Sequence, residues 1–433
     1  MRYLTAALAL GAALLPQAAA TQPVTAITVD VADSGDTAWI LTASALVLMM
    51  AIPGLALFYG GLVRVKNAMS VYLQVGAIVA ICSLLWVVVG YTLAFGEVGS
   101  GWIGDGSRWM MIRLDAWRAD TTLPESAFAL FQMTFFAITP ALMAGAWVER
   151  ARFGWVVAFC ALWSLIVYAP VAHWIWGGGW LSDLGVFDFA GGLVVHTTAG
   201  VSALVVALLL GRRNGFPAKP MLPHSPTLVV IGAAMLWVGW FGFNGGSALT
   251  ATDDASTAII NTHVAAATAA LMWIAIEKIS FGKSTGIGFA TGAIAGLATI
   301  TPAAGAVAPG AAIIFGLLAA PICYFTIRLV KHRFHIDDSL DVFAVHGVGG
   351  MLGTLLFAVF GLAAFGGTVE GITFGDQFIA QMIGIAVVGG YAAVATALIA
   401  LAVSLFLPMR VGEDSERHGL DTATHGEHAF KLD

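Results

Sequence analysis

The fold is decided by two similar stretches of sequence, Asp188-Phe-Ala-Gly-Gly-Leu-Val-Val-His196 and Asp338-Ser-Leu-Asp-Val-Phe-Ala-Val-His346. Each begins with an aspartate and ends with a histidine that follows a valine, and a glycine lies four residues further on (Gly200 and Gly350). An ionisable side chain inside a membrane span is costly, and it usually faces a cavity or a pathway. The repetition therefore predicts two related halves that face each other across one pathway, as in a transporter or channel.

The composition around these stretches is that of a polytopic membrane protein. Of the 433 residues, 59% are hydrophobic and only 10% are charged, whereas an ordinary soluble domain carries about 25% charged residues. Apolar runs of roughly 20 residues recur along the chain, long enough to cross a bilayer. The net charge of −6 indicates little about partners, and nothing suggests nucleic acid. The cysteines have neither a disulfide pattern nor metal-ligand spacing, so we expect no metal and no cofactor.

Residues 1–20 are predicted to be a signal peptide. A short basic start with Arg2 precedes an apolar stretch over 4–15 and the small residues 18–20, which is the arrangement of a cleaved secretory signal. The alternative is a short extra span. A cleaved signal places the mature N-terminus outside and indicates a bacterial inner-membrane protein.

The remaining chain is predicted to cross the membrane eleven times, as an all-α polytopic membrane protein. Starting outside, alternation places all basic residues on the inside except Arg2 and the three arginines of the first outer loop, Arg108, Arg113 and Arg118. This agrees with the positive-inside rule and leaves the N-terminus periplasmic and the C-terminus cytoplasmic. The expected spans are 38–62, 70–95, 123–146, 155–173, 191–211, 226–246, 257–277, 285–301, 309–330, 340–362 and 377–407.

The two histidine stretches fall in the fifth and tenth spans. An offset of five spans is odd, so the second half must run through the membrane in the opposite direction. We therefore expect two inverted five-helix repeats, approximately 38–213 and 226–362, with the site near the midplane between them. The last helix, 377–407, completes a transport domain over 36–407, and 408–433 form a cytoplasmic tail.

Several motifs resemble the ammonium transporter family, the Amt/Mep/Rh group, and specifically its bacterial Amt branch. They are spread over essentially the whole mature chain, and the long stretch from Asp188 to Arg213 is the most specific. The resemblance implies a homotrimer of eleven-helix protomers, each with its own pore. The matching stretches are Asp36-Thr-Ala-Trp39, Ile52-Pro-Gly-Leu-Ala-Leu-Phe-Tyr-Gly-Gly-Leu-Val-Arg64, Asp188 through Arg213, Gly239-Trp-Phe-Gly-Phe-Asn244 and Asp341-Val-Phe-Ala-Val-His-Gly347.

The resemblance also implies a role for particular side chains. His196 and His346 match the paired pore histidines, which line the ammonia path and relay a proton. Phe135 and Phe243 match two stacked rings that gate the outer pore. The outer cation-recruitment site corresponds to Phe131, Trp176 and Ser247, and Asp188 matches the supporting carboxylate beneath it. Independently of the resemblance, Asp188 also suits a helix cap, and Asp337, Asp338 and Asp341 are expected to cap the helix of the tenth span.

These residue types fit transport of ammonium. Aromatic faces attract cations, a hydroxyl can accept a hydrogen bond from the ion, and an apolar pore passes neutral ammonia far more easily than a bare cation. A neutral imidazole donates from one ring nitrogen and accepts at the other. We favour electrogenic uptake, with the proton relayed separately. A neutral ammonia gas channel and an ammonium sensor are the alternatives, and no arrangement typical of an enzyme is found.

The polar tail matches the ordered tail of bacterial Amt proteins at Glu416-Arg-His-Gly-Leu-Asp421 and His425-Gly-Glu427. Composition alone is equally consistent with a disordered end. The resemblance implies that the tail packs on the inner face, links protomers and helps to dock a PII-type nitrogen regulatory protein. A family sensor usually carries an additional output domain, and this tail is short.

Overall fold

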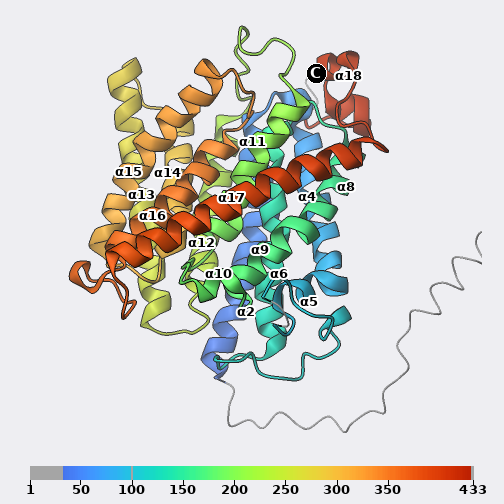
Figure 1. Ribbon diagram of the computed structural model, residues 1–433. Helices are drawn as coiled ribbons and strands as arrows, with labels where there is room; N and C mark the ends of the chain where they lie inside the picture. Colours follow the sequence, from blue (N-terminus) through green and yellow to red (C-terminus); the bar gives the residue numbers. More distant parts are fainter. Residues whose placement is uncertain (1–32, 99–100, 431–433) are drawn as a thin grey trace, which may run out of the picture.

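The computed structural model describes residues 33–98 and 101–430 (Figure 1). The predicted signal peptide lies outside the described residues. Within them, eleven helical segments are long and apolar enough to cross a membrane, so the predicted all-helical, eleven-span fold is confirmed. Backbone amides and carbonyls find no water in hydrocarbon, and helices satisfy these groups internally.

Most spans are built from several consecutive helices, and the η segments are short 3₁₀ or π turns within them. The first five spans consist of α2 (Ser34–Met49), η1 (Met50–Gly54) and α3 (Leu55–Leu62); η2 (Val65–Asn67), α4 (Ala68–Leu85), η3 (Trp86–Gly90) and α5 (Tyr91–Phe95); α6 (Glu125–Leu142) and α7 (Ala144–Trp147); α8 (Phe153–Trp163), η5 (Ser164–Tyr168), α9 (Ala169–Trp176) and α10 (Trp180–Asp183); and η6 (Gly192–Thr197) with α11 (Thr198–Leu210). The other six are α12 (Pro226–Gly246); α13 (Asp253–Phe281); α14 (Gly286–Ile300) with η7 (Thr301–Ala303); α15 (Pro309–Arg328) with η8 (Leu329–Arg333); η9 (Phe343–Val348) with α16 (Gly349–Phe360); and α17 (Phe374–Ser404).

The two inverted repeats lie side by side. In Figure 1 the blue and green helices of the first repeat occupy the right of the bundle, the yellow and orange helices of the second occupy the left, and α17 crosses them obliquely. The histidine-bearing segments meet at the centre, since η6 contacts η9 and α16, while η9 contacts α11. This reciprocal packing is what two halves related by a two-fold axis in the membrane plane require.

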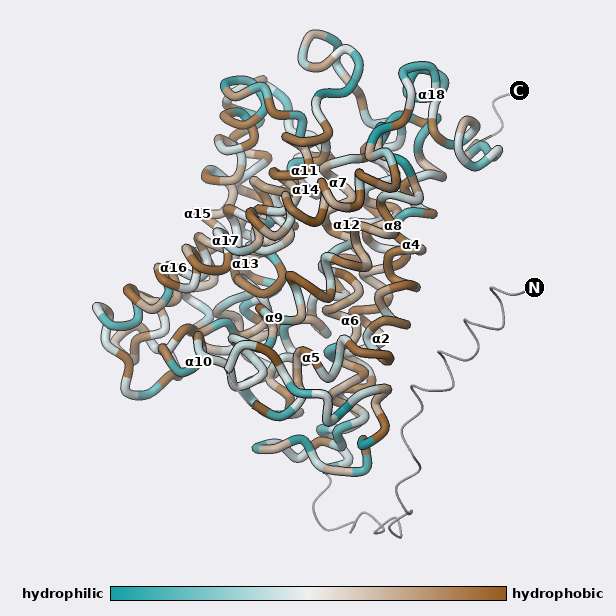
Figure 2. The backbone as a smooth tube through the Cα atoms, turned by 45° about the vertical axis from the view of Figure 1, so that its right-hand side comes forward, coloured by the Kyte–Doolittle hydropathy of each residue, from teal (hydrophilic) through white to brown (hydrophobic). Residues whose placement is uncertain are grey.

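Hydropathy separates the middle of the bundle from its ends (Figure 2). Brown, hydrophobic backbone fills the middle, and teal loops gather at both ends, with the tail at one of them. Large apolar side chains such as Leu84, Leu208 and Leu398 are exposed on the spans. A soluble protein rarely leaves so much apolar surface uncovered, and such a surface suits a membrane.

The tail is ordered against the end of the bundle where it emerges. Its two short helices, α18 (Glu413–His418) and η11 (Asp421–His425), follow the last span. The Asp421 carboxylate accepts hydrogen bonds from the amides of Met69 and Ser70, at 3.1 and 2.8 Å, and so caps the start of α4. Glu416 accepts from the amide of Asn214 at 2.6 Å. We call the end of the bundle against which the tail packs the tail end of the molecule.

Candidate functional site

The fifth span begins at a carboxylate that binds four backbone amides. Asp188 accepts hydrogen bonds from Gly191 (2.9 Å), Gly192 (2.6 Å), Leu193 (2.8 Å) and Val194 (3.0 Å). The turn depends on Gly191, whose φ of 120° suits glycine alone. Burial raises the pKa of Asp188, and the four amide bonds oppose that rise. The carboxylate therefore has the helix-cap role expected of it, and it lies buried within the bundle.

Glycines allow the two histidine-bearing spans to cross in contact. A Cβ atom on Gly200 would lie only 2.2 Å from the backbone nitrogen of Gly347. A Cβ on Gly350 would lie 2.5 Å from the carbonyl oxygen of Gly192 and 2.8 Å from the Cβ of His196. Small residues let membrane helices approach this closely, so the glycine that follows each histidine belongs to the geometry of the site.

The crossing brings His196 and His346 into direct contact. Their Nδ1 atoms are 3.2 Å apart and the ring centroids 5.2 Å apart, and the two residues are 1% and 4% exposed. In a hydrogen bond between two Nδ1 atoms one ring donates and the other accepts, so the two neutral rings have opposite tautomers. The Nε2 atom of His196 is buried and has no hydrogen-bond partner among the described residues.

Aromatic rings continue from His196 away from the tail end. Its ring stacks on Trp240 at 5.5 Å and on Phe243 at 6.0 Å. Phe243 in turn contacts Phe135, with centroids 4.3 Å apart and planes at 42°. The two predicted gate rings are thus in contact, tilted rather than parallel. The cavity beside them measures about 10 Å³ and is lined, apart from the histidines, by aliphatic and aromatic side chains. This constriction has room for about one water molecule.

Beyond the aromatic rings lies a wider cavity of about 680 Å³, which we call the vestibule. Trp176 and Ser247 line it together with Phe135. The Trp176 indole donates to the backbone oxygen of Asp188 at 2.7 Å, which holds the ring in place. The Ser247 hydroxyl donates to the Phe243 carbonyl at 2.9 Å, so its own oxygen is left to accept a hydrogen bond.

Phe131, the third member of the expected recruitment site, is fully buried. It packs edge-on at 4.9 Å against Phe135, which lines the vestibule. The stripe of α6 that faces the vestibule is formed by Phe128, Gln132 and Phe135, which follow helical spacing. Phe131 lies beside that stripe and supports the gate ring from behind.

Gln132 is a vestibule residue that sequence analysis missed. Its side-chain oxygen is buried and has no hydrogen-bond partner among the described residues. A buried acceptor without a partner is expensive, and a cation in the vestibule would supply one. The sequence could have indicated Gln132, because an amide side chain within an apolar span is itself unusual.

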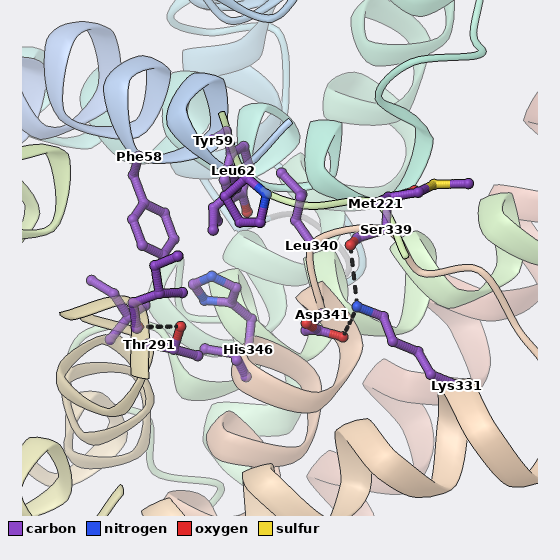
Figure 3. Close-up of a pocket in the computed structure, with 14 residues that line it drawn as sticks. Phe58, Tyr59, Leu62, Met221, Thr291, Lys331, Ser339, Leu340, Asp341 and His346 are labelled. Carbon is purple, nitrogen blue, oxygen red and sulfur yellow. Dashed lines mark hydrogen bonds and ion pairs between the residues drawn. The ribbon is translucent and has the colours of Figure 1, made fainter. Parts of the chain in front are cut away.

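On the tail-end side of the histidines lies a cavity of about 210 Å³, which we call the tail-end cavity (Figure 3). His346 lines it, together with Phe58 and Tyr59 of α3. Lys331 and Asp341 also line it, and their side chains form an ion pair at 2.7 Å. Sequence analysis did not assign Lys331 to the site.

Of the three aspartates expected to cap the tenth span, only Asp338 does so. Its carboxylate accepts from the Phe343 amide at 2.8 Å. Asp337 pairs with Arg213 at 2.8 Å, and Asp341 pairs with Lys331. The expectation was wrong for Asp337 and Asp341, because the loop before the span folds back onto basic side chains from other elements.

The Arg213–Asp337 pair belongs to a buried charged cluster at the tail end. Arg213 also binds Glu149 at 2.9 Å, and Glu149 binds Arg64 at the same distance. Burial alone would raise the pKa of Asp337, but the hydrogen bonds and charge of Arg213 outweigh it and lower that pKa to about 2. The cluster joins the loops after the first, third, fifth and ninth spans.

A vestibule, an aromatic constriction, two touching histidines and a second cavity, in line through a bundle of eleven spans, define a multi-pass membrane protein that conducts a small molecule. Comparison with known proteins names the class more closely. Residues 38–430 match the family model described as Ammonium Transporter Family. The chain is 44% identical to an ammonium transporter of Aquifex aeolicus, covering 92% of this chain and 94% of the relative, and 44% identical to an ammonium transporter of Bacillus subtilis, covering 92% and 98%.

Solved structures agree with this assignment. Mep2 of Saccharomyces cerevisiae superposes with a TM-score of 0.82 at 37% identity, over 91% of this chain and 92% of Mep2. A protein described as a sensor Amt protein superposes with a TM-score of 0.85 at 30% identity, over 90% and 98%. The chain belongs to the ammonium transporter family. It is a transport protein and not an enzyme.

Proposed function

We propose that the chain takes up ammonium electrogenically through the path that runs from the vestibule to the tail-end cavity. Ammonium is recruited by the faces of Trp176 and Phe135 and by the Ser247 hydroxyl, and the buried charge of Asp188 attracts it without contact. Phe131 contributes by holding Phe135. The cation gives up its proton before the constriction, because moving a bare charge through an apolar pore costs several kcal/mol or more.

Ammonia then passes Phe135 and Phe243 and crosses along the two histidines, while the proton moves separately through the imidazoles. The observation that carries this proposal is the 3.2 Å contact between the Nδ1 atoms of His196 and His346 inside a constriction of about 10 Å³. Linked imidazoles are able to hand on a proton, since each ring has one donor and one acceptor nitrogen. The constriction has no room for a hydrated sodium or potassium ion.

The proposal includes a location and partners. The basic loops and the tail lie on the cytoplasmic side of the inner membrane, and the vestibule faces the periplasm. The protein works as a homotrimer with one pore in each protomer. The ordered tail and the loops beside it form the cytoplasmic face on which a PII-type nitrogen regulatory protein docks.

Current and uptake in proteoliposomes test this function. An ammonium jump is expected to give a saturable inward current in the wild type, and His196→Ala is expected to lower it at least about tenfold, because the imidazole link is lost. His263→Ala, a histidine of α13 that does not line the pore cavities, is the matched control. Protein-dependent uptake without current would support a neutral ammonia channel instead. Normal uptake and current in His196→Ala would contradict the histidine path.

A further inference from the structure

Among the described residues that line the tail-end cavity, Asp341 supplies the one carboxylate, and its backbone conformation is unusual. Asp341 has a φ of 65°, in the left-handed region that non-glycine residues seldom adopt. It lies two residues before η9, the segment that carries His346. Figure 3 shows its carboxylate directed toward Lys331 at the side of the cavity that His346 also lines. The backbone strain is retained where the carboxylate reaches the pore.

Lys331 fixes this carboxylate in position. The Nζ atom of Lys331, a residue of η8, is 2.7 Å from Asp341 and donates to the backbone oxygen of Ser339 at 3.2 Å. Both side chains are about one-fifth exposed, at 20% and 22%. The cation favours the charged form of the carboxylate, and its exposed fraction leaves it accessible to water in the cavity.

Other polar groups of the cavity wall have their protons engaged elsewhere. The Tyr59 hydroxyl donates to the carbonyl of Leu142 at 2.9 Å. The Thr291 hydroxyl donates to the carbonyl of Ile287 at 2.9 Å. Among the described residues that line this cavity, Asp341 is therefore the group best able to accept a proton that leaves His346.

Asp341 also lines a second space, which we call the side cavity. It measures about 360 Å³ and is more open than the tail-end cavity. Ionisable side chains on its wall include Glu277, Arg328 and His332. The two cavities share Ile287, Thr291 and Asp341. Of these three, only Asp341 is ionisable, so it stands between the pore and a separate polar route to the tail end.

We propose that Asp341 is the proton acceptor at the inner end of the pore and passes the proton from the histidine path into the side cavity, while ammonia leaves through the tail-end cavity. This inference rests on the proposed function. As the Nδ1–H bond of His196 breaks, an N–H bond forms at Nδ1 of His346, and His196 regains a proton at Nε2 from the vestibule side. The N–H bond at Nε2 of His346 breaks in turn, a water molecule of the tail-end cavity carries the proton across, and an O–H bond forms on the Asp341 carboxylate. The proton then passes to water in the side cavity, and the carboxylate is restored.

The electrostatics around Asp341 agree with this role. Burial raises the pKa of Asp341 above its ordinary value, and the neighbouring Lys331 limits that rise. An acceptor must bind a proton and also release it, and such a group works best when its pKa is brought toward the working pH. The ionisable groups around the Asp341 carboxylate, from all elements that face it, are Lys331, Asp337, Asp338, Arg213, Tyr59, His346, Glu277, Arg328 and His332.

The test is the ammonium-induced current in proteoliposomes at constant outside pH and varied inside pH. Asp341→Asn is expected to lower the current at least about tenfold, and Asp341→Glu to restore most of it. Glu413→Gln, which removes a carboxylate from the exposed pair with Arg417, is expected to behave as wild type. A wild-type current in Asp341→Asn would overturn the proposal.

Lys331→Met provides a second, independent variant, and it serves where Asp341→Asn fails to fold. Without the cation the carboxylate binds its proton more tightly, so the dependence of the current on inside pH is expected to move to higher pH. An unchanged profile would mean that the pair is structural, and the proposal would be wrong. The wild type separates the two ideas: absence of current there refutes electrogenic transport itself, whereas a wild-type current with unaffected variants refutes only the role of Asp341.

Discussion

The two histidine-bearing spans begin with equivalent aspartates in very different surroundings. Asp188 accepts from four backbone amides. Asp338 accepts from the single amide of Phe343 at a hydrogen-bonding distance, and its Oδ1 atom is buried without a partner among the described residues. The cap of the fifth span is thus made by bonds to the backbone of that span. At the tenth span, the ion pair between Lys331 and Asp341 lies close to the capping aspartate. The two inverted repeats thus have the same arrangement of helices, but equivalent positions near opposite sides of the membrane make different side-chain contacts.

The largest expected difference between the halves concerns stability. Asp188→Ala leaves four buried amides without an acceptor, at about 1–3 kcal/mol each, so we expect a loss of at least about 4 kcal/mol even after local relaxation. Asp338→Ala removes one such bond, worth about 1–3 kcal/mol, and also removes a carboxylate whose ionisation burial opposes, so its net loss is expected to be close to zero at neutral pH. Thermal unfolding of the purified protein in detergent measures both. Equal losses would show that the four amide bonds are not what distinguishes the two spans.

A smaller effect on stability is expected for Asp337 and Asp338, two neighbours in one loop whose stability contributions depend on pH in opposite ways. Burial opposes ionisation of Asp337, but Arg213 outweighs it and lowers the pKa of Asp337 to about 2. The ionised carboxylate therefore contributes stability at pH values above its ordinary pKa near 4, and this stability is lost as the pH falls toward 2. That contribution is about 2 kcal/mol. Asp337→Asn is therefore expected to lower the unfolding temperature at neutral pH.

Asp338 is expected to behave in the opposite way. Burial and the nearby Asp341 raise its pKa to about 6, so the stability that comes from its protonated form is present at pH 4 and is lost as the pH rises through 6. Asp338→Asn keeps an oxygen for the Phe343 amide and is expected to gain up to about 3 kcal/mol at neutral pH. Unfolding temperatures measured across this pH range check both variants. A lower unfolding temperature for Asp338→Asn at neutral pH would contradict the interpretation.

The smallest effect is expected in the tail. Glu416 is 2% exposed and binds both Arg410 and the Asn214 amide, whereas Glu413 is 82% exposed in its pair with Arg417. Exposed pairs contribute little. Glu416→Gln should therefore release the tail and speed its cleavage by a protease several-fold, and Glu413→Gln should leave the rate unchanged. Similar cleavage of both variants would mean that the tail is held mainly by Asp421.

Sequence analysis anticipated the parts of the site that depend on the spans themselves. Eleven apolar runs and the duplicated Asp-to-His stretch were sufficient to predict the fold and to bring His196 and His346 together. The packing of Phe131 against Phe135 could not be predicted, because the direction of each stripe of α6 depends on how the helix is rotated against its neighbours. Helical spacing gives the members of each stripe and not the direction in which it points.

The Lys331–Asp341 pair was beyond prediction for a related reason. Lys331 ends one span and Asp341 precedes the next, and they meet because the connecting loop folds back on itself. No local pattern encodes such a return. Asp337 and Asp341 were assigned as caps for the same reason, since their partners Arg213 and Lys331 become neighbours only in the folded protein.

The most direct test of the central claim is the charge moved for each ammonium taken up. Current and uptake of isotopically labelled ammonium are measured on the same proteoliposomes at a fixed membrane potential. If the proton and ammonia part at the constriction and both cross, the ratio is one positive charge for each molecule of ammonia delivered. A ratio of zero, with uptake intact, would show that only ammonia crosses and that the histidines carry no proton.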